Sequence, residues 1–332
     1  MTELLSVDRY LLDALPEVWF GVVMFALAIY VVLDGFDFGI GMLYATRSDE
    51  DDRETLLSVF GPVWDANEVW LVAFGTMLLA AFPSVYSRLL ADNYLLVIGF
   101  VLALLFRGIA PELREQCEDD RWQRMCDASF VGGSTLAPLL FGVLAGRWIF
   151  DVPTLSVPAL LTGVGLTTVS VVTGAAFISA KTGSSLAADL RRYGIAGTVS
   201  YLGGVAILLT TVVVTDAGGT ADAVLSVPIA VVVALSALSG LAGIGFARRE
   251  QYRRWLVSAL TLPALLSLLV ALLLYPVIYP ATGLTVREAV VSPLALNLVT
   301  VMGLPVLLLV LWYFKFLYGV FSGPVVDESY GP

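Results

Sequence analysis

The chain has 332 residues, of which 58% are hydrophobic and 14% are charged, and its formal net charge is −10. A soluble domain has about 25% charged residues, so this composition excludes an ordinary soluble protein. The sequence contains no histidine. Its own side chains therefore cannot supply His-ligated haem or zinc, a Ser-His-Asp triad or a histidine proton shuttle. Nothing in the charge pattern favours nucleic-acid binding.

Apolar stretches long enough to cross a ~30 Å hydrocarbon core recur from end to end. We expect an all-α integral membrane protein that forms a single polytopic domain over residues 1–332. No stretch between the apolar segments is long enough for a separate soluble domain. The nine predicted membrane helices cover residues 17–45, 56–81, 94–110, 128–150, 156–180, 195–215, 224–247, 256–279 and 294–318.

The basic residues predict the orientation. When the connections between the nine helices alternate between two sides, fourteen of the eighteen basic residues fall on one side. The positive-inside rule then places that side, with the C-terminus, in the cytoplasm and the N-terminus outside. The first segment is not expected to be a signal peptide, because its flank and its interior carry carboxylates. We expect a multi-pass protein of the cell membrane.

The first predicted helix carries two acids at membrane depth. Asp34 and Asp37 are three residues apart and share a helical face, with Tyr30 one turn before Asp34. Gly35 and Gly39 form a small-xxx-small pair that lets another helix come close. An ionised carboxylate at the centre of a membrane helix costs about 2.5–3.5 kcal/mol. The acids are therefore neutral, paired or lining a polar path, although a role in helix packing alone stays open.

The second predicted helix carries the motif WDANEVW. Asp65 and Glu68 share a face, and Trp64 and Asn67 flank it. Four unpaired charged acids in the two helices would cost on the order of 10 kcal/mol together. This pattern indicates proton or ion handling, and a purely structural polar network is the alternative.

The expected depths of the acids agree. At 1.5 Å per residue, Asp37 lies roughly 15 Å from the cytoplasmic end of its helix. In a continuous helix from Leu56, Asp65 lies roughly 14 Å and Glu68 roughly 18 Å from the same side. We therefore predict that the two sets meet in the cytoplasmic half of the membrane, where bound water could pass protons between them.

The third predicted helix ends in FRGIAPELR. Arg107 stands near its inner end, with Glu112 after it. The arginine could extend its guanidinium to the headgroups while its stem stays buried. Alternatively, it could be the counter-ion of one of the buried acids.

These stretches carry a resemblance to a known family. The runs GFDFGIGML, PVWDANEVWL, FPSVYS and FRGIAPELR, in this order and near these spacings, resemble subunit II of cytochrome bd-type quinol oxidases. The resemblance is strongest over residues 20–115, and the nine-helix hydropathy profile extends it more weakly to the C-terminus. The cyanide-insensitive branch belongs to the same family, and this chain does not separate the two branches.

The resemblance implies a respiratory-chain quinol:oxygen oxidoreductase, in which this chain is a non-haem subunit that is not catalytic alone. Subunit I would carry haems of the b and d types and oxidise quinol, while dioxygen is reduced to water. The family fold has two four-helix bundles plus one extra helix. A structural quinone in this chain and a small accessory subunit are left open. Carried over to this sequence, the proton path from the cytoplasm comprises Asp34, Asp37, Asp65 and Glu68, with Trp64 and Asn67 as supports. From the sequence itself we add Tyr30, Arg107 and Glu112 as supporting residues.

Two other functions fit the buried acids. A standalone secondary transporter could use them for proton coupling, since prolines interrupt several later segments. However, no half-to-half repeat is visible and the later helices have no intramembrane acids. In a purely structural assembly subunit, the acids would hold the subunit interface instead.

The loops are rich in acids, and two lysines stand against sixteen arginines. Solvated loop faces explain this pattern, and so does adaptation to a salt-rich, halophilic cytoplasm, where screening weakens repulsion between like charges.

Overall fold

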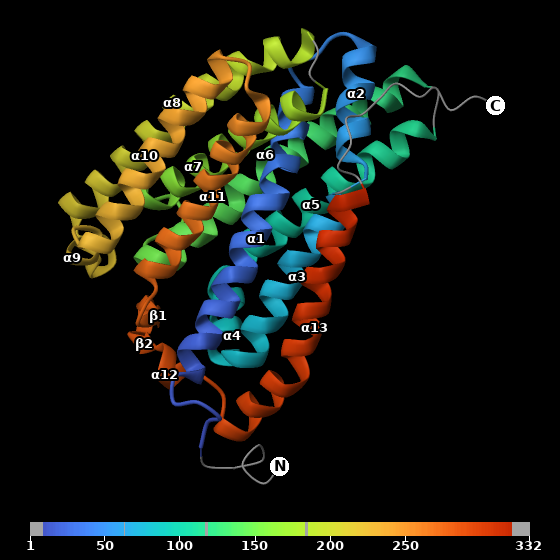
Figure 1. The fold of residues 1–332 in the computed structure, drawn as a ribbon. Helices are drawn as coiled ribbons and strands as arrows, with labels where there is room; N and C mark the ends of the chain where they lie inside the picture. Colours follow the sequence, from blue (N-terminus) through green and yellow to red (C-terminus); the bar gives the residue numbers. More distant parts are fainter. Residues whose placement is uncertain (1–8, 63, 117–118, 183–184, 321–332) are drawn as a thin grey trace.

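The computed structural model describes residues 9–62, 64–116, 119–182 and 185–320. Almost all of this part of the chain is helical (Figure 1). The long helices are α1 (Leu15–Tyr44), α5 (Tyr94–Glu115), α6 (Asp120–Phe150), α7 (Val157–Thr182), α8 (Ser185–Thr215), α10 (Val227–Arg248), α11 (Tyr252–Leu273) and α13 (Pro293–Val320). The shorter elements are α2 (Glu50–Phe60), α3 (Trp64–Ala81), α4 (Pro83–Asp92), the 3₁₀ turn η1 (Ala217–Gly219), α9 (Ala221–Val224), the strands β1 (Val277–Tyr279) and β2 (Leu284–Thr285) with the 3₁₀ turn η2 (Pro280–Thr282) between them, and α12 (Val286–Ala289).

The long helices form two groups, as the resemblance implied. In the first group, α1 packs against α3 and α6, and α6 packs against α5. In the second group, α7 packs against α8 and α11, and α10 packs against both α8 and α11. Helix α13 lies beside α3 at the edge of the first group (Figure 1). The short helix α2 lies at one end of the molecule, and the antiparallel pair β1–β2 with α12 lies at the other. We call these the α2 end and the hairpin end. In the predicted orientation the α2 end faces the cytoplasm.

The two groups meet where α7 packs against α6 and α1, and a glycine crossing lies between α1 and α7. A Cβ atom on Gly39 would lie 2.0 Å from the carbonyl oxygen of Ser170 and 2.8 Å from the Cα of Gly174. Only glycine permits so short a separation between the two helix backbones. The packing function predicted for Gly39 therefore lies at the junction of the two groups, on the side of α1 away from α3.

The predicted continuous helix over residues 56–81 is wrong. Helix α2 ends at Phe60 and α3 begins at Trp64, with Gly61 and Pro62 between them. A proline ring disfavours helical geometry at the residue before it and removes a backbone donor, so a helix tends to end there. Asp65 and Glu68 therefore stand in the first turns of a new helix, not 14 or 18 Å along an old one as roughly estimated from the helical rise.

The prediction of nine membrane helices is not confirmed. Within the described residues, eight helices are long and apolar enough to cross a membrane, by length and composition alone. Helix α3 is not among them, because the polar residues Asp65, Asn67 and Glu68 in its first turns lower the mean hydropathy of its 18 residues. The predicted segment 256–279 also ends early, since α11 stops at Leu273 and residues 277–279 form β1. Tyr275, which precedes Pro276, is disfavoured from a helical conformation for the same reason.

Candidate functional site

The candidate site lies inside the first helix group, where α1, α3 and α5 meet. Helix α1 supplies Asp34 and Asp37, and both side chains are fully buried. Their three-residue spacing turns both carboxylates to the same side of α1. Tyr30 is also buried, one turn before Asp34. The helical pattern of the sequence thus explains why these groups occur together.

Arg107 of α5 joins two of the acids. Its side chain is fully buried, and its Nη1 donates a hydrogen bond to Asp34 Oδ1 at 2.5 Å. Its Nη2 donates to an oxygen of Glu68 on α3. The guanidinium also lies 4.6 Å from the ring centroid of Phe38 and 5.8 Å from that of Phe60. Arg107 thus pairs with acids from two helices, the buried Asp34 and the partly exposed Glu68, and its charged group does not extend to the membrane surface.

Asn67 of α3 extends the network toward α13. Its Nδ2 donates to Asp37 Oδ2 at 2.7 Å, and its Oδ1 accepts a hydrogen bond from the Tyr318 hydroxyl at 2.7 Å. The two ends of one amide therefore connect α1 to α13. Tyr318 was not among the residues predicted from the sequence. A tyrosine at the last position of an apolar segment is a weak signal, because such positions commonly hold tyrosine at the membrane interface.

Trp64 covers the α2 side of the cluster. Its ring stacks on Phe60 with centroids 5.7 Å apart and an interplanar angle of 5°. It also lies against Gly108 of α5, where a Cβ atom would come within 2.8 Å of the indole. The break between α2 and α3 thus lets Trp64 stack on Phe60 and lie against α5, and its supporting function stays a prediction.

Three carboxylates and one guanidinium meet in the interior. Asp34 and Glu68 are paired with Arg107, and Asp37 accepts from the neutral amide of Asn67. Because an unpaired buried charge costs several kcal/mol, charge balance favours protons on two of the three carboxyls. Asp37 Oδ1, Arg107 Nε and Ser134 Oγ are buried without a hydrogen-bond partner among the residues that the structure describes. These three polar atoms are therefore available to bind water.

Two predicted site residues do not join this cluster. Asp65 and Glu112 are exposed, and the hydrogen bonds and ion pairs of the cluster within the described ranges include neither of them. Glu68 is intermediate, since 26% of its side chain is exposed. The site thus grades from a surface acid, Asp65, through Glu68 to two carboxylates with no exposure.

Comparison with known proteins identifies the family. Residues 15–321 match the family described as cytochrome bd terminal oxidase subunit II. The chain belongs to this family. The resemblance inferred from the motifs is thereby confirmed, and with eight candidate spans the chain is a multi-pass protein of the cell membrane.

Individual relatives match over part of the chain. It is 38% identical over 134 residues to cytochrome bd ubiquinol oxidase subunit 2 of Bacillus subtilis, which is 40% of this chain and 39% of that protein. It is 35% identical over 143 residues to cytochrome bd-I ubiquinol oxidase subunit 2 of Escherichia coli, which is 42% of this chain and 38% of that protein. The matched stretches thus span well under half the length of these relatives.

The fold has a solved counterpart. A chain from the structure of bd oxidase from Geobacillus thermodenitrificans superposes with a TM-score of 0.77, covering 93% of this chain and 98% of that chain. The two sequences are 14% identical. At this identity the likeness shows the shared fold.

Proposed function

We propose that this chain is subunit II of a quinol:oxygen oxidoreductase of the respiratory chain, supporting a haem-bearing subunit I and supplying a proton path from the cytoplasm for the reduction of dioxygen to water. The observation that carries the proposal is the buried Arg107, bonded to both Asp34 and Glu68. Family membership supports the proposed reaction, and the buried cluster supports the proposed path.

The exposure of the acids gives the path a direction. Asp65 is exposed in the first turn of α3 and would collect protons at the surface. Glu68, which is partly exposed, would receive them, and Asp34 and Asp37 lie beyond it with no exposure. Arg107 stays charged throughout, because a guanidinium does not deprotonate in proteins. When a proton neutralises one carboxyl, another carboxyl of the cluster would release its own proton onward, so that one carboxylate remains to balance the charge of Arg107.

The side chains of this subunit would move protons and not electrons. With no histidine in the sequence, the usual imidazole ligation of a haem is absent from this chain. Within the described residues, no group of three His, Cys, Asp or Glu side chains could hold a metal ion. The placement of the haems of the b and d types and of quinol oxidation in subunit I is part of this proposal, and it rests on the family resemblance. A structural quinone and an accessory subunit stay predictions.

The test is the activity of the assembled complex with single acids neutralised. We expect Glu68→Gln and Asp37→Asn each to lower quinol-dependent oxygen consumption and proton uptake on the order of 100-fold, the effect of losing a positioned proton-transfer group. Glu54→Gln, at an exposed acid of α2, is the matched control. Unchanged turnover and proton uptake in both interior variants, with the complex assembled, would refute the path.

A standalone proton-coupled transporter is the second candidate, and the break between α2 and α3 favours it, because transporters place broken helices at their ion sites. A haem assay on the tagged chain, purified in mild detergent from its native membrane, separates the two. Recovery of a haem-bearing partner with quinol oxidase activity supports the oxidase. Recovery of the chain alone and colourless, under conditions that keep other complexes intact, supports the transporter.

A further inference from the structure

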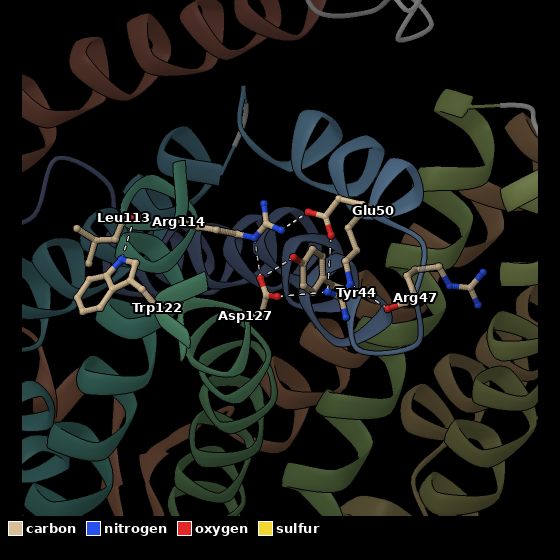
Figure 2. Close-up of polar contacts among 8 residues, drawn as sticks. Tyr44, Arg47, Glu50, Leu113, Arg114, Trp122 and Asp127 are labelled. Atoms are coloured by element: carbon tan, nitrogen blue, oxygen red, sulfur yellow. Dashed lines mark hydrogen bonds and ion pairs between the residues drawn. The ribbon is translucent and has the colours of Figure 1, made fainter. Parts of the chain in front are cut away.

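A second polar cluster lies at the α2 end, outside the candidate site, and its centre is Asp127 of α6 (Figure 2). The carboxylate accepts hydrogen bonds from three other helices. The Tyr44 hydroxyl of α1 donates at 2.6 Å, Arg114 Nε of α5 at 2.9 Å and Arg53 Nη1 of α2 at 3.3 Å. One side chain thus ties α1, α2 and α5 to α6.

Further contacts hold α2 within this cluster. Arg114 Nη2 also donates to Glu50 at the start of α2. Arg53 Nε donates to the carbonyl oxygen of Arg47 at 2.9 Å, and its guanidinium lies 5.2 Å from the ring centroid of Tyr44. The acids and bases therefore form a closed network in which each arginine contacts two helices or more.

The residues that follow Asp127 on α6 reach the candidate site. The Phe130 ring makes edge contacts with Tyr44 and with Phe60, at centroid separations of 5.5 and 5.1 Å. Gly133 lies directly against the backbone of Arg107, where a Cβ atom would come within 2.6 Å of its nitrogen. Helix α6 is thus in contact with the helices of both partners of the Asp34–Arg107 pair.

On both α1 and α5, the residue of the Asp127 cluster stands at the same distance along the helix from the residue of the candidate site. Tyr44 stands seven residues after Asp37, and Arg114 stands seven residues after Arg107. Seven residues make two helical turns, or about 10.5 Å, so each pair shares a face. Pro111 lies between Arg107 and Arg114 and removes the backbone hydrogen bond that would end at the Arg107 carbonyl. The last turn of α5 therefore depends on outside contacts to hold its position.

We propose that Asp127 is a positioning residue for the buried cluster. By bonding to both Tyr44 and Arg114, Asp127 fixes the position of α5 along its axis relative to α1. It thereby sets the position of Arg107 relative to Asp34 and Glu68. This inference rests on the proposed function for its effect on turnover, but not for its effect on geometry. Asp127 does not lie on the proton path itself.

The low exposure of the cluster makes its effect large enough to measure. The side chains of Asp127 and Arg114 are 15% and 11% exposed, and that of Arg53 is 27% exposed. Removing one partner of a largely buried ion pair leaves the other charge uncompensated, whereas exposed pairs contribute little. Loss of the Asp127 charge would leave Arg114 and Arg53 with Glu50 as their remaining carboxylate partner in the cluster, and because 51% of the Glu50 side chain is exposed, the hold on α5 beyond Pro111 would weaken.

The experiment compares Asp127→Asn with Asp127→Glu and Asp189→Asn in the complete complex. Asparagine keeps the shape and an acceptor for Tyr44 but removes the charge, and glutamate restores the charge. Asp189 pairs with Arg47 at 3.3 Å at the same end, but 66% of its side chain is exposed, so it is the matched control. The readouts are the yield of haem-bearing complex, the pH profile of quinol oxidase turnover, and the infrared carboxyl bands that disappear in Asp34→Asn.

We expect the Asp127→Asn complex to assemble and its turnover to fall roughly 10-fold, because small misplacements of reacting groups have effects of this kind. We also expect the pH profile of turnover and the Asp34 infrared band to shift. Asp127→Glu should recover most of each change, and Asp189→Asn should match the unmodified complex.

Unchanged infrared bands and pH profile in Asp127→Asn would overturn the proposal, as would a loss of turnover that is fully explained by a lower yield of the complex. If Asp127→Asn does not assemble, Tyr44→Phe removes one of the three bonds and is held to the same infrared criterion. The infrared shift is measured whether or not Glu68→Gln impairs turnover, so failure of the proton path and failure of this proposal give different results.

Discussion

The two helix groups share one membrane but use their buried polar residues in opposite ways. In the first group, Asp34, Asn67 and Arg107 bond from one helix to another. In the second group, most buried hydroxyls bond back to their own helix, three or four residues earlier. The partly buried Ser239 differs, since it donates to Ser258 O on the neighbouring helix. The hydroxyls bonded within their own helix include Ser170, Thr198, Ser236 and Ser267.

The difference shows what each group is built for. A hydroxyl bonded within its own helix satisfies its polar atoms locally, so neighbouring helices need only match in shape. A carboxylate cannot be satisfied this way, because an ionised acid in the interior needs a counter-charge from elsewhere. Chemistry in the first group therefore requires a fixed arrangement of several helices, while the second group provides packing. Substitutions should affect the two groups unequally.

The largest effect is expected for Arg107→Ala. It leaves Asp34 buried without its counter-ion, and breaking such a pair costs about 3–5 kcal/mol. We expect a lower melting temperature of the purified complex or a loss of assembly. Arg253→Ala, at an exposed position of α11, is the control, and equal melting temperatures for the two variants would contradict the assignment.

The junction of the groups should be the next most sensitive. Gly39→Ala would force a methyl group against the carbonyl oxygen of Ser170, and overpacking of this kind costs about 1–3 kcal/mol. We expect a reduced melting temperature. Gly165→Ala, where a Cβ atom would meet nothing within 4 Å, should have little effect. Comparable losses in both variants would show that the crossing is not the cause.

A smaller effect is expected where the network reaches α13. Tyr318→Phe removes the donor to Asn67 Oδ1 and should cost about 0.5–1.5 kcal/mol. Because Asn67 also holds Asp37, oxidase turnover should fall measurably. Ser267→Ala removes a hydroxyl bonded only within its own helix and should leave turnover unchanged. A greater loss of turnover in Ser267→Ala than in Tyr318→Phe would contradict the assignment of chemistry to the first group and packing to the second.

The smallest effect is expected at the hairpin end, outside both groups. Glu288 accepts from the backbone N–H and the hydroxyl of Thr285, and these bonds lower the pKa of its carboxyl. A lowered pKa stabilises the folded turn above the ordinary glutamate pKa of about 4.3, and this contribution is lost as the pH falls through the lowered value. Amide exchange in Val286–Ala289 should therefore quicken in acid. In Glu288→Gln the exchange should show no such step, and a step that persisted would assign it to another group.

Much of the site could be predicted from the sequence, because short spacings determine a helical face. The shared face of Asp34 and Asp37 follows from three residues of separation, and the cost of buried charge made Arg107 a candidate counter-ion. The break before Trp64 was missed, although the Gly61-Pro62 pair is a known signal for the end of a helix. Because the residues on both sides of this pair are largely apolar, the hydropathy pattern predicted one continuous helix.

Longer-range contacts were beyond the sequence. Tyr318 and Asn67 are 251 residues apart, and no pattern in a single chain pairs them. Asp127 was assigned to a loop, because the predicted helix began at residue 128, whereas α6 begins at Asp120. A hydropathy profile does not include charged residues at the start of a membrane helix. Asp127 is such a residue, and its contacts join four helices.

The separation of Asp34 from Arg107 has a consequence for synthesis of the chain. The two residues are 73 positions apart, so at 5–20 residues per second the ribosome needs about 4–15 s to add the arginine after the aspartate. During that interval α1 exists without its counter-ion. Its two carboxyls must then stay protonated or be held by the insertion machinery, and α1 settles into its final position only when α5 arrives.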